Sequence, residues 1–468
     1  GACGAPSAEY ACSRCRAARF CGPECFRAAW KAHKLVCTTA TAIDGTRINN
    51  AREAAKTAGH VMPPAHDASC DIAEGRIFIS VVAYCDPELP VTLRALLAHA
   101  VRPELLSVGL VWQGAGDPLT DRDLDDLAEL WGDVGAAWAS RSGQTAAAPG
   151  PGSAPRDAPG GLLPLPAGRQ VSWMALLGGR IRLVQLPSEE ARGPCWARYL
   201  AQLLWRGEEL YLQLDSHMRF VPHWDRRARE ELAWCARVSP KPVLCGYGRG
   251  YQLGAPPDWV PPEDLTAAFN CAGFFDGDRI LNIRYRALKS DWPHPWRSFF
   301  WSAHFSFSSA AVLREVPYDP QLLMLFFGEE ILMTVRLFTS GWDLYAPAQG
   351  LVYHLWERDY RRVYVTDMQE LYADLVRPAR RRLHWLLGSG PEPFFQEDVE
   401  PWPLPGDAAP RGHEVDPFGL GSVRTRTEYE LAAGLSFEAG WLGEAALRGG
   451  APSEDCFMAR EEGGQSAV

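Results

Sequence analysis

The chain has 468 residues, of which 47% are hydrophobic and 11% aromatic, as expected for a globular protein with a large core. Its formal net charge of −10 argues against a nucleic-acid-binding surface, and no apolar run reaches the roughly 18 residues that a transmembrane helix needs. We therefore expect neither nucleic acid nor membrane among its partners.

Cysteine usage indicates metal-bound and free thiols rather than a disulfide framework. Six of the thirteen cysteines fall within the first 37 residues, and the others are scattered without paired spacing. This pattern favours a reducing compartment. Close pairs of thiolate and imidazole groups are the ligands of tetrahedral structural zinc. The candidate zinc ligands are Cys3, Cys12, Cys15, Cys21, Cys25, His33 and Cys37.

A βαβ pattern follows a predicted linker at residues 38–74. Residues 76–84 form a β-branched run typical of a buried strand, residues 90–100 have helical spacing, and residues 105–112 predict a second strand. This order indicates a doubly wound α/β domain, which we place at residues 75–450. The chain contains no G-x-G-x-x-G and no Walker loop, so neither a dinucleotide site nor a P-loop is expected.

Three segments interrupt or follow this domain. Residues 140–168 are rich in Ala, Gly, Pro and Ser and predict a low-complexity insertion. Residues 391–409 are Pro-rich and acidic, as in a loop, and residues 451–468 are expected to form a disordered tail. The chain begins with Gly1 rather than Met, so we expect a fragment or a processed form.

The candidate site begins where a predicted buried strand, residues 210–214, ends in Asp215, Ser216 and His217. Open α/β sheets bind their ligands at the carboxyl ends of strands. A carboxylate and an imidazole two residues apart can hold a divalent ion against a diphosphate. An Asp-x-His pair also arises commonly by chance, so this signal needs support from the rest of the chain.

Three further residues are candidates for the same site. Glu329 and Glu330 begin a predicted helix, and His354 directly follows a predicted strand. Each has a plainer explanation, because acidic residues are favoured at helix starts and a single His is commonly a surface group. Their order along the chain makes the combination more informative than any one member.

Two sequence blocks are distinctive. Residues 212–220 read Leu-Gln-Leu-Asp-Ser-His-Met-Arg-Phe, and residues 326–331 read Phe-Phe-Gly-Glu-Glu-Ile. With these blocks the chain, from residue 75 to about residue 450, resembles the hydroxyproline α-N-acetylglucosaminyltransferases, cytosolic enzymes that modify the adaptor subunit of SCF ubiquitin ligases. Further matching segments are residues 79–87, 109–113, 197–198, 316–320, 353–354 and 418–425.

A more distant similarity, to the polypeptide N-acetylgalactosaminyltransferases, rests on the Asp-Ser-His block, the Gly-Glu helix start and the later His. This similarity implies a GT-A fold and an Mn²⁺ ion, or Mg²⁺, held by Asp215, His217 and His354. The closer resemblance implies a retaining transfer of N-acetylglucosamine from UDP-N-acetylglucosamine (UDP-GlcNAc) to a protein hydroxyl. Hydroxyproline, on an SCF adaptor, is the acceptor that it suggests.

The resemblance also assigns roles to residues. Asp215, Glu329 and Glu330 are the expected catalytic residues, and either glutamate is expected to bind sugar or acceptor hydroxyls. Arg198 is expected to place a cation near the diphosphate. No nucleophile stands out, so we expect a front-face displacement in which the acceptor hydroxyl gives its proton to the departing phosphate. The expected donor-binding residues are Ala83, Tyr84, Asp86, Arg198, Asp215 and His217.

The amino-terminal cysteines resemble a MYND zinc finger, in which eight ligands bind two interleaved zinc ions. By that resemblance one zinc site consists of Cys12, Cys15, His33 and Cys37. The second consists of Cys3, Cys21 and Cys25 and lacks a Cys that is expected about three residues before Cys3. MYND fingers bind peptides, so residues 1–37 are expected to recruit a peptide partner in the cytoplasm.

Two departures from the expected pattern leave alternatives open. Cys85 stands where the Tyr-Arg-Asp signature has Arg, and His304 stands where a smaller residue is expected beside a sugar. A GalNAc-type or other UDP-sugar transferase, or one with a Ser/Thr acceptor, is therefore an alternative. Cys85 and the long insertion also motivate a non-catalytic MYND scaffold with a decayed transferase domain. A MYND-containing methyltransferase is disfavoured, because nothing after residue 75 resembles a methyl-donor site.

Overall fold

The computed structural model describes residues 72–132, 161–165, 169–259, 266–289, 294–390 and 416–458, and the backbone of β1 (Tyr10–Ala11) and β2 (Arg19–Phe20). The expected zinc ligands lie outside the described residues, as do most of the predicted linker and the loop at residues 391–409.

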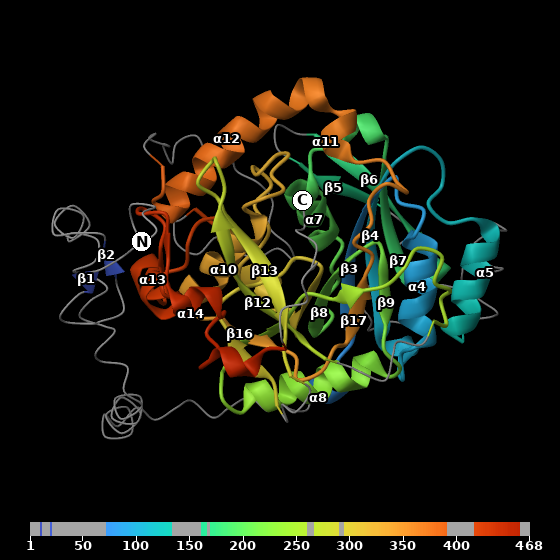
Figure 1. The fold of residues 1–468 in the computed structure, drawn as a ribbon. Coiled ribbons are helices and arrows are strands. Elements are labelled where there is room, and N and C mark those ends of the chain that lie inside the picture. The colour runs from blue at the N-terminus through green and yellow to red at the C-terminus, as the bar shows by residue number, and fades with distance from the viewer. Residues whose placement is uncertain are drawn as a thin grey trace.

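A ten-stranded mixed sheet forms the centre of the molecule (Figure 1). The neighbours β8, β3, β4 and β7 are parallel, whereas β15 runs antiparallel to both β8 and β10. In sheet order the strands are β14 (Trp296–Ser298), β16 (Asp343–Ala346), β10 (Pro242–Cys245), β15 (Phe305–Ser309), β8 (Leu210–Asp215), β3 (Ile77–Tyr84), β4 (Leu106–Gln113), β7 (Ile181–Leu186), β6 (Gln170–Leu176) and β5 (Gly161–Pro164).

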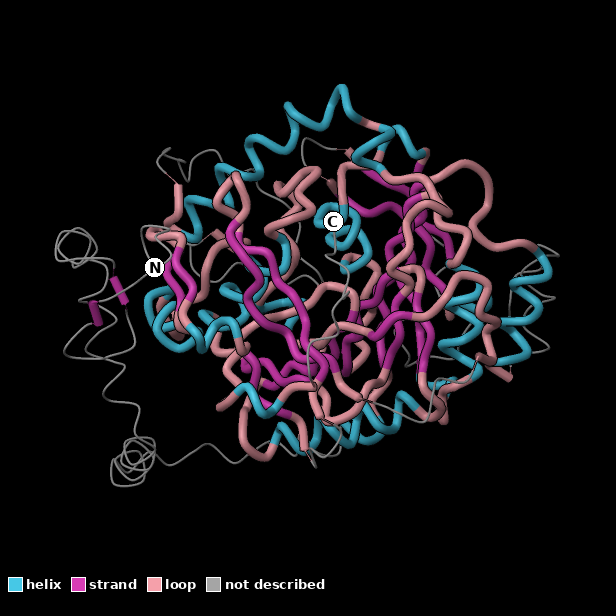
Figure 2. The backbone as a smooth tube through the Cα atoms, in the orientation of Figure 1, coloured by secondary structure: helices cyan, strands magenta, loops and turns pink. Residues whose placement is uncertain are grey.

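Helices pack on both sides of this sheet and give the α/β fold expected from the sequence (Figure 2). Successive side chains of a strand point to opposite faces. Phe78 of β3 thus belongs to the core with α7, α10, α12 and α13, whereas Ile77, Ile79 and Val81 belong to the core with α4, α5 and α8. These helices are α4 (Leu89–Ala98), α5 (Asp121–Leu130), α7 (Pro194–Gln202), α8 (Trp224–Ala236), α10 (Glu329–Thr339), α12 (Gln369–Leu387) and α13 (Arg426–Ala433).

Smaller elements complete the architecture. A three-stranded sheet, β11-β17-β9, and a hairpin of β12 and β13 are separate from the main sheet. The remaining elements are short helices and one further strand pair. Their bounds are β9 (Met218–Phe220), β11 (Arg249–Gly250), β12 (Ala268–Phe275), β13 (Leu281–Ala287), β17 (Val352–His354), β18 (Leu435–Ser436), β19 (Trp441–Leu442), α9 (Val312–Glu315), α11 (Tyr364–Asp367) and α14 (Glu444–Leu447).

Two segments differ from the sequence-based expectation. Gly161–Pro164, within the predicted insertion, form β5 because they pair antiparallel with β6 and bury Leu163. Residues 451–458, assigned to a disordered tail, are ordered: Phe457 is buried against Phe269 and pairs with Leu288. Among the helices in the described ranges, none is both long and apolar enough to cross a membrane.

Candidate functional site

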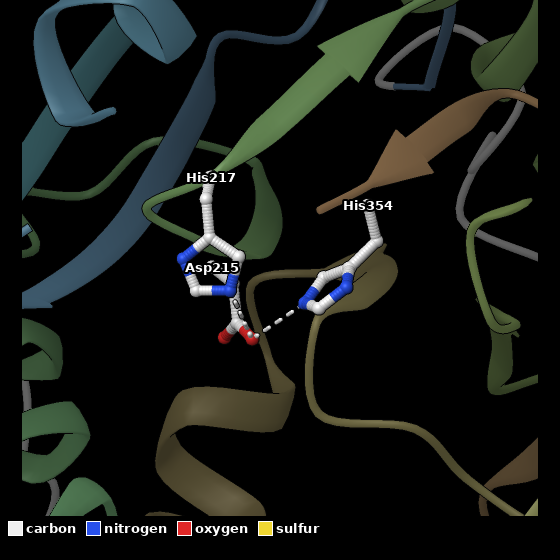
Figure 3. A group of neighbouring side chains, drawn as sticks. All are labelled: Asp215, His217 and His354. Atoms are coloured by element: carbon white, nitrogen blue, oxygen red, sulfur yellow. Dashed lines mark ion pairs between the residues drawn. The ribbon is translucent and has the colours of Figure 1, made fainter. Parts of the chain in front are cut away.

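Three side chains predicted as metal ligands converge in space: Asp215, His217 and His354 (Figure 3). One ligand atom from each lies within 4.8 Å of the others. Nε2 of His354 is 3.4 Å from Oδ2 of Asp215, and Nε2 of His217 is 4.0 Å from the same oxygen. These separations suit atoms that share one cation.

Strand pairing explains this convergence. Asp215 ends β8, beside Val82 of β3 in parallel register. His217 immediately precedes β9, and β9 pairs antiparallel with β17 so that His354 faces Met218. The loop between β8 and β9 is only two residues long, which holds His217 close to Asp215.

Asp86 lies behind His217 and fixes its ring. Oδ2 of Asp86 is 2.7 Å from Nδ1 of His217 and accepts a 2.6 Å hydrogen bond from the Ser216 hydroxyl. Burial raises the pKa of Asp86, but His217, Arg361 and Ser216 outweigh it and lower the pKa to about 2. The ionised carboxylate therefore accepts the Nδ1 proton, and Nε2 is left as an electron-pair donor toward the cluster.

The cluster fits a divalent metal ion. Burial lowers the pKa of His354 to about 4, so its imidazole is neutral, the form that binds metals, at physiological pH. One carboxylate and two imidazoles suit a first-row divalent ion and leave coordination positions for other ligands. Asp86 supplies the outer carboxylate that commonly orients a metal-binding His.

Arg198 connects Asp215 to Glu329. Its guanidinium donates to Oδ1 of Asp215 at 2.5 Å and to Oε1 of Glu329, which also accepts a 2.5 Å hydrogen bond from Tyr318. Burial opposes ionisation of Asp215, but Arg198 and the two histidines outweigh it and hold the pKa of Asp215 well below its usual range. Arg198 is thus paired with two carboxylates, and its predicted contact with a diphosphate stays a prediction.

Glu330 has separate partners. Its Oε2 accepts a 2.6 Å hydrogen bond from Tyr247, and its Oε1 accepts one of 2.9 Å from the backbone N–H of Ala303. Burial raises the pKa of Glu330 to about 7, although both hydrogen bonds oppose that shift. The two adjacent glutamates therefore differ in environment, because Glu329 has an arginine partner and Glu330 does not.

The three clustered ligands border one cavity of about 200 Å³ together with Arg198, Glu329 and Glu330. Ala83 and Tyr84, expected to hold uridine, also line it. Asp86 is 1% exposed and lies behind His217 instead. The lining residues that were not identified from the sequence include Arg358 and Arg361, on the segment that follows β17. The basic run at residues 358–362, soon after His354, was the available signal.

The two residues that depart from the family pattern also have defined positions. Cys85 has a φ of 47° at the end of β3, and its Sγ accepts from Arg362 at 3.8 Å. His304 is buried, and its Nε2 accepts a 2.8 Å hydrogen bond from the backbone N–H of Gly248. Its ring lies 4.8 Å from that of His354, so it packs against a predicted metal ligand.

Comparison with known structures finds distant likenesses. GalNAc-T7, in a structure with UDP, GalNAc and Mn²⁺, aligns at 12% identity and a TM-score of 0.40, over 67% of this chain and 51% of that one. This chain thus matches about half the length of GalNAc-T7. S. aureus TarS 1–349 with UDP-GlcNAc aligns at 12% identity and a TM-score of 0.31, over 67% of this chain and 72% of that one.

Sequence comparison is more decisive. No curated protein matches the chain. The family model described as "Glycosyltransferase (GlcNAc)" matches residues 76–439, and that of the MYND finger matches residues 1–37. Because the first match covers more than half of the 468 residues, the chain belongs to the GlcNAc glycosyltransferase family and carries a MYND finger before its transferase domain.

Proposed function

We propose that this glycosyltransferase moves N-acetylglucosamine from UDP-GlcNAc to a protein hydroxyl, with retention of configuration and with a divalent metal ion, Mn²⁺ or Mg²⁺. The observation that carries the proposal is the convergence of Asp215, His217 and His354 on one cavity in a chain of this family. The imidazole ligands favour Mn²⁺ over Mg²⁺.

Asp215, His217 and His354 would hold the ion. When bound, it supplies positive charge that stabilises the leaving diphosphate. The protein's own residues prepare this position: Asp86 orients His217, and Arg198 keeps Asp215 ionised and directed toward the histidines. A preorganised charge arrangement of this kind stabilises a transition state without costly rearrangement during the reaction.

The carboxylates of the cavity support a front-face displacement. Asp215 belongs to the metal cluster, Glu329 is bound by Arg198 and Tyr318, and Glu330 is bound by Tyr247 and Ala303. Each of the three already has such a role in the site, which favours a displacement without a protein nucleophile. In the proposed step, a bond forms between the acceptor oxygen and C1 of the sugar while the C1–phosphate oxygen bond breaks. The acceptor proton passes to the departing phosphate oxygen, so atoms and charge balance.

The donor is proposed to lie along the end of β3. Ala83 and Tyr84 line the cavity there, and the Tyr84 hydroxyl donates to Asp367 at 2.7 Å, which fixes the ring. Arg361, whose Nε is 3.8 Å from Oδ2 of Asp86, lines the same cavity and is a candidate partner for the diphosphate. The glutamates Glu329 and Glu330 remain the proposed contacts for sugar or acceptor hydroxyls.

Hydroxyproline as the acceptor, and a cytoplasmic location, rest on the family resemblance.

The MYND finger is proposed to bind zinc through Cys12, Cys15, His33 and Cys37, with an incomplete second site at Cys3, Cys21 and Cys25. Its proposed role is to recruit a peptide partner. Metal analysis of the purified chain by mass spectrometry tests the zinc content: one firmly bound zinc is expected, and none would contradict the proposal.

A matrix assay tests the function. The purified chain is incubated with Mn²⁺ and one of UDP-GlcNAc, UDP-GalNAc, UDP-glucose or UDP-galactose, and with peptides containing hydroxyproline, proline or Ser/Thr. We expect transfer only with UDP-GlcNAc and hydroxyproline, loss of transfer in EDTA, and an α-linkage by NMR. Preference for another sugar or for Ser/Thr would identify the alternative enzyme, and failure to bind Mn²⁺ or UDP would favour the scaffold.

A further inference from the structure

Exposed aromatic side chains gather beside the site. Among the residues that the structure describes, five large aromatic side chains are exposed, and only Trp441 lies away from the cavity. Contiguous exposed apolar groups next to a catalytic cavity mark a binding surface. We call the other four residues the aromatic rim: Phe274, Tyr285, Phe326 and Phe327.

The rim is continuous with the cavity wall. Phe274, Phe326 and Phe327 line the cavity directly. Tyr285 stacks on two lining residues, with ring centroids 5.5 Å from Tyr247 and 5.9 Å from Trp356 and interplanar angles of 21° and 17°. Near-parallel aromatic faces of this kind accommodate prolyl rings and other apolar groups of an extended peptide.

Two arginines give the rim a positive charge. Cζ of Arg284 lies 4.8 Å from the ring centre of Phe274, and Cζ of Arg358 lies 5.2 Å from that of Phe326. Within the described ranges neither arginine has a carboxylate at ion-pair distance, unlike Arg198, which has two. In a chain of net charge −10, this local positive charge favours an acidic partner.

The environment of Arg358 supports the same conclusion. Arg358 is only partly exposed, and burial together with the neighbouring Arg361 lowers its pKa. Asp215 offsets part of this shift, but no carboxylate of the described residues lies at ion-pair distance from Arg358. A carboxylate brought by a partner would therefore gain more here than at a fully hydrated arginine.

We propose that the aromatic rim docks the acceptor as an extended protein segment in which acidic side chains flank the accepting residue. Apolar groups of the segment pack on the rim, and its carboxylates pair with Arg284 and Arg358. This inference rests on the proposed function, because it requires a protein acceptor. It adds a surface for the acceptor and a sequence preference, neither of which follows from the metal cluster.

The test uses a hydroxyproline peptide with acidic flanks and the same peptide with Gln and Asn flanks, both fluorescently labelled. Binding to the full chain is followed by anisotropy in the presence of UDP and Mn²⁺, and transfer is followed by mass spectrometry. The variants are Phe274→Ala, Phe326→Ala and Arg284→Glu. Trp441→Ala, an equally exposed aromatic away from the cavity, is the matched control.

We expect each rim variant to weaken binding of the acidic peptide by about tenfold or more, since buried aromatic contacts and charge pairs dominate such interfaces. Arg284→Glu should barely change binding of the neutral-flank peptide. Trp441→Ala should leave the binding of both peptides unchanged. UDP affinity, measured by calorimetry, serves as the check that each variant is folded.

The outcomes separate the two proposals. If transfer occurs but the rim variants bind and use the acidic peptide as the wild type does, the docking surface is overturned and the proposed function stands. If no sugar is transferred but peptide binding still depends on the rim, the proposed function fails, and the rim stands as a docking surface for an acidic segment but not for an acceptor. A rim variant that converts a dimer to a monomer in light scattering, with unchanged peptide affinity, would assign the rim to contact between two copies.

Discussion

Nδ1 of His217 lies 2.7 Å from the Asp86 carboxylate, and this contact joins the end of β3 to the metal cluster. The two residues are 131 positions apart in sequence. Parallel pairing of β3 with β8 brings them together, because it places the two strand ends side by side. We therefore propose that Asp86 is a positioning residue, which would act on a bound metal ion through His217 rather than by direct contact.

Replacing Asp86 with Asn tests that role. The Asp86→Asn variant keeps the shape but loses the negative charge that holds the His217 tautomer, so Mn²⁺ affinity should fall roughly 10- to 100-fold. Isothermal calorimetry on the full chain measures it. Ser216→Ala, which removes only the hydroxyl donor to Asp86, should have a much smaller effect. Equal Mn²⁺ affinity in Asp86→Asn and wild type would show that the contact is not used in metal binding.

Removal of a proposed metal ligand should abolish most turnover. In Asp215→Ala and His354→Ala we expect UDP release to fall by about 100-fold or more, since the ion supplies several kcal/mol of charge stabilisation. The assay is Mn²⁺-dependent UDP release at saturating UDP-GlcNAc. His294→Ala is the matched control, because this exposed histidine stacks on Trp234 and does not line the cavity. Undiminished turnover in either ligand variant would refute the proposed metal site.

Arg198 should be a major determinant of stability. Replacing it with Met leaves Asp215 and Glu329 without their shared cation, and breaking a buried ion pair in this way typically costs about 3–5 kcal/mol. Denaturant unfolding in EDTA measures the loss. The double variant Arg198→Met/Glu329→Gln should recover part of it, because one uncompensated charge is removed. A double variant as unstable as the sum of both single changes would exclude the coupling.

The sequence predicted that Asp215, His217 and His354 would lie together because its signals are local. Asp215 and His217 stand at the end of an apolar strand, β8, and His354 is the last residue of another, β17. The position of Arg361 was not predictable in this way, because it depends on how the segment after β17 folds over the cavity. The burial of Phe457 was missed for a similar reason: its contact with Phe269 spans almost two hundred residues, and the local composition resembles that of a tail.

Glu330 should give the free energy of unfolding a distinctive pH dependence. Its pKa is raised from the usual 4.5 to about 7, so folding favours the protonated form. This contribution is fully present below about pH 4.5 and is lost as the pH rises through about 7, at about 1.4 kcal/mol per pH unit. Glu330→Gln mimics the protonated form and should remove that slope.

Urea unfolding in EDTA at pH 5, 6, 7 and 8 measures the dependence on Glu330. The stability difference between wild type and Glu330→Gln should shift in favour of the variant between pH 5 and about pH 7 and level off towards pH 8. Glu357→Gln, at an exposed position, controls for the loss of one negative charge. Parallel pH profiles of wild type and Glu330→Gln would contradict the raised pKa.

Gly328 sets the start of α10 and therefore the position of both glutamates. Its φ is 105°, and a Cβ atom there would lie 2.4 Å from Cδ1 of Leu383 in α12. Gly328→Ala should cost at least about 1 kcal/mol from the backbone conformation alone. Glu329 directly follows Gly328, so a shift of the helix start also moves the Glu329 carboxylate away from Arg198. UDP release should therefore fall by more than the loss of stability explains.

Gly341→Ala separates the loss of stability from the displacement of Glu329. Gly341, after the other end of α10, has a similar φ of 87°, and its Cβ would meet Val423 rather than the site. Both variants should lower the melting temperature, but only Gly328→Ala should lower turnover well below the melting transition. Equal loss of turnover in the two variants would mean that general destabilisation, and not displacement of Glu329, is responsible.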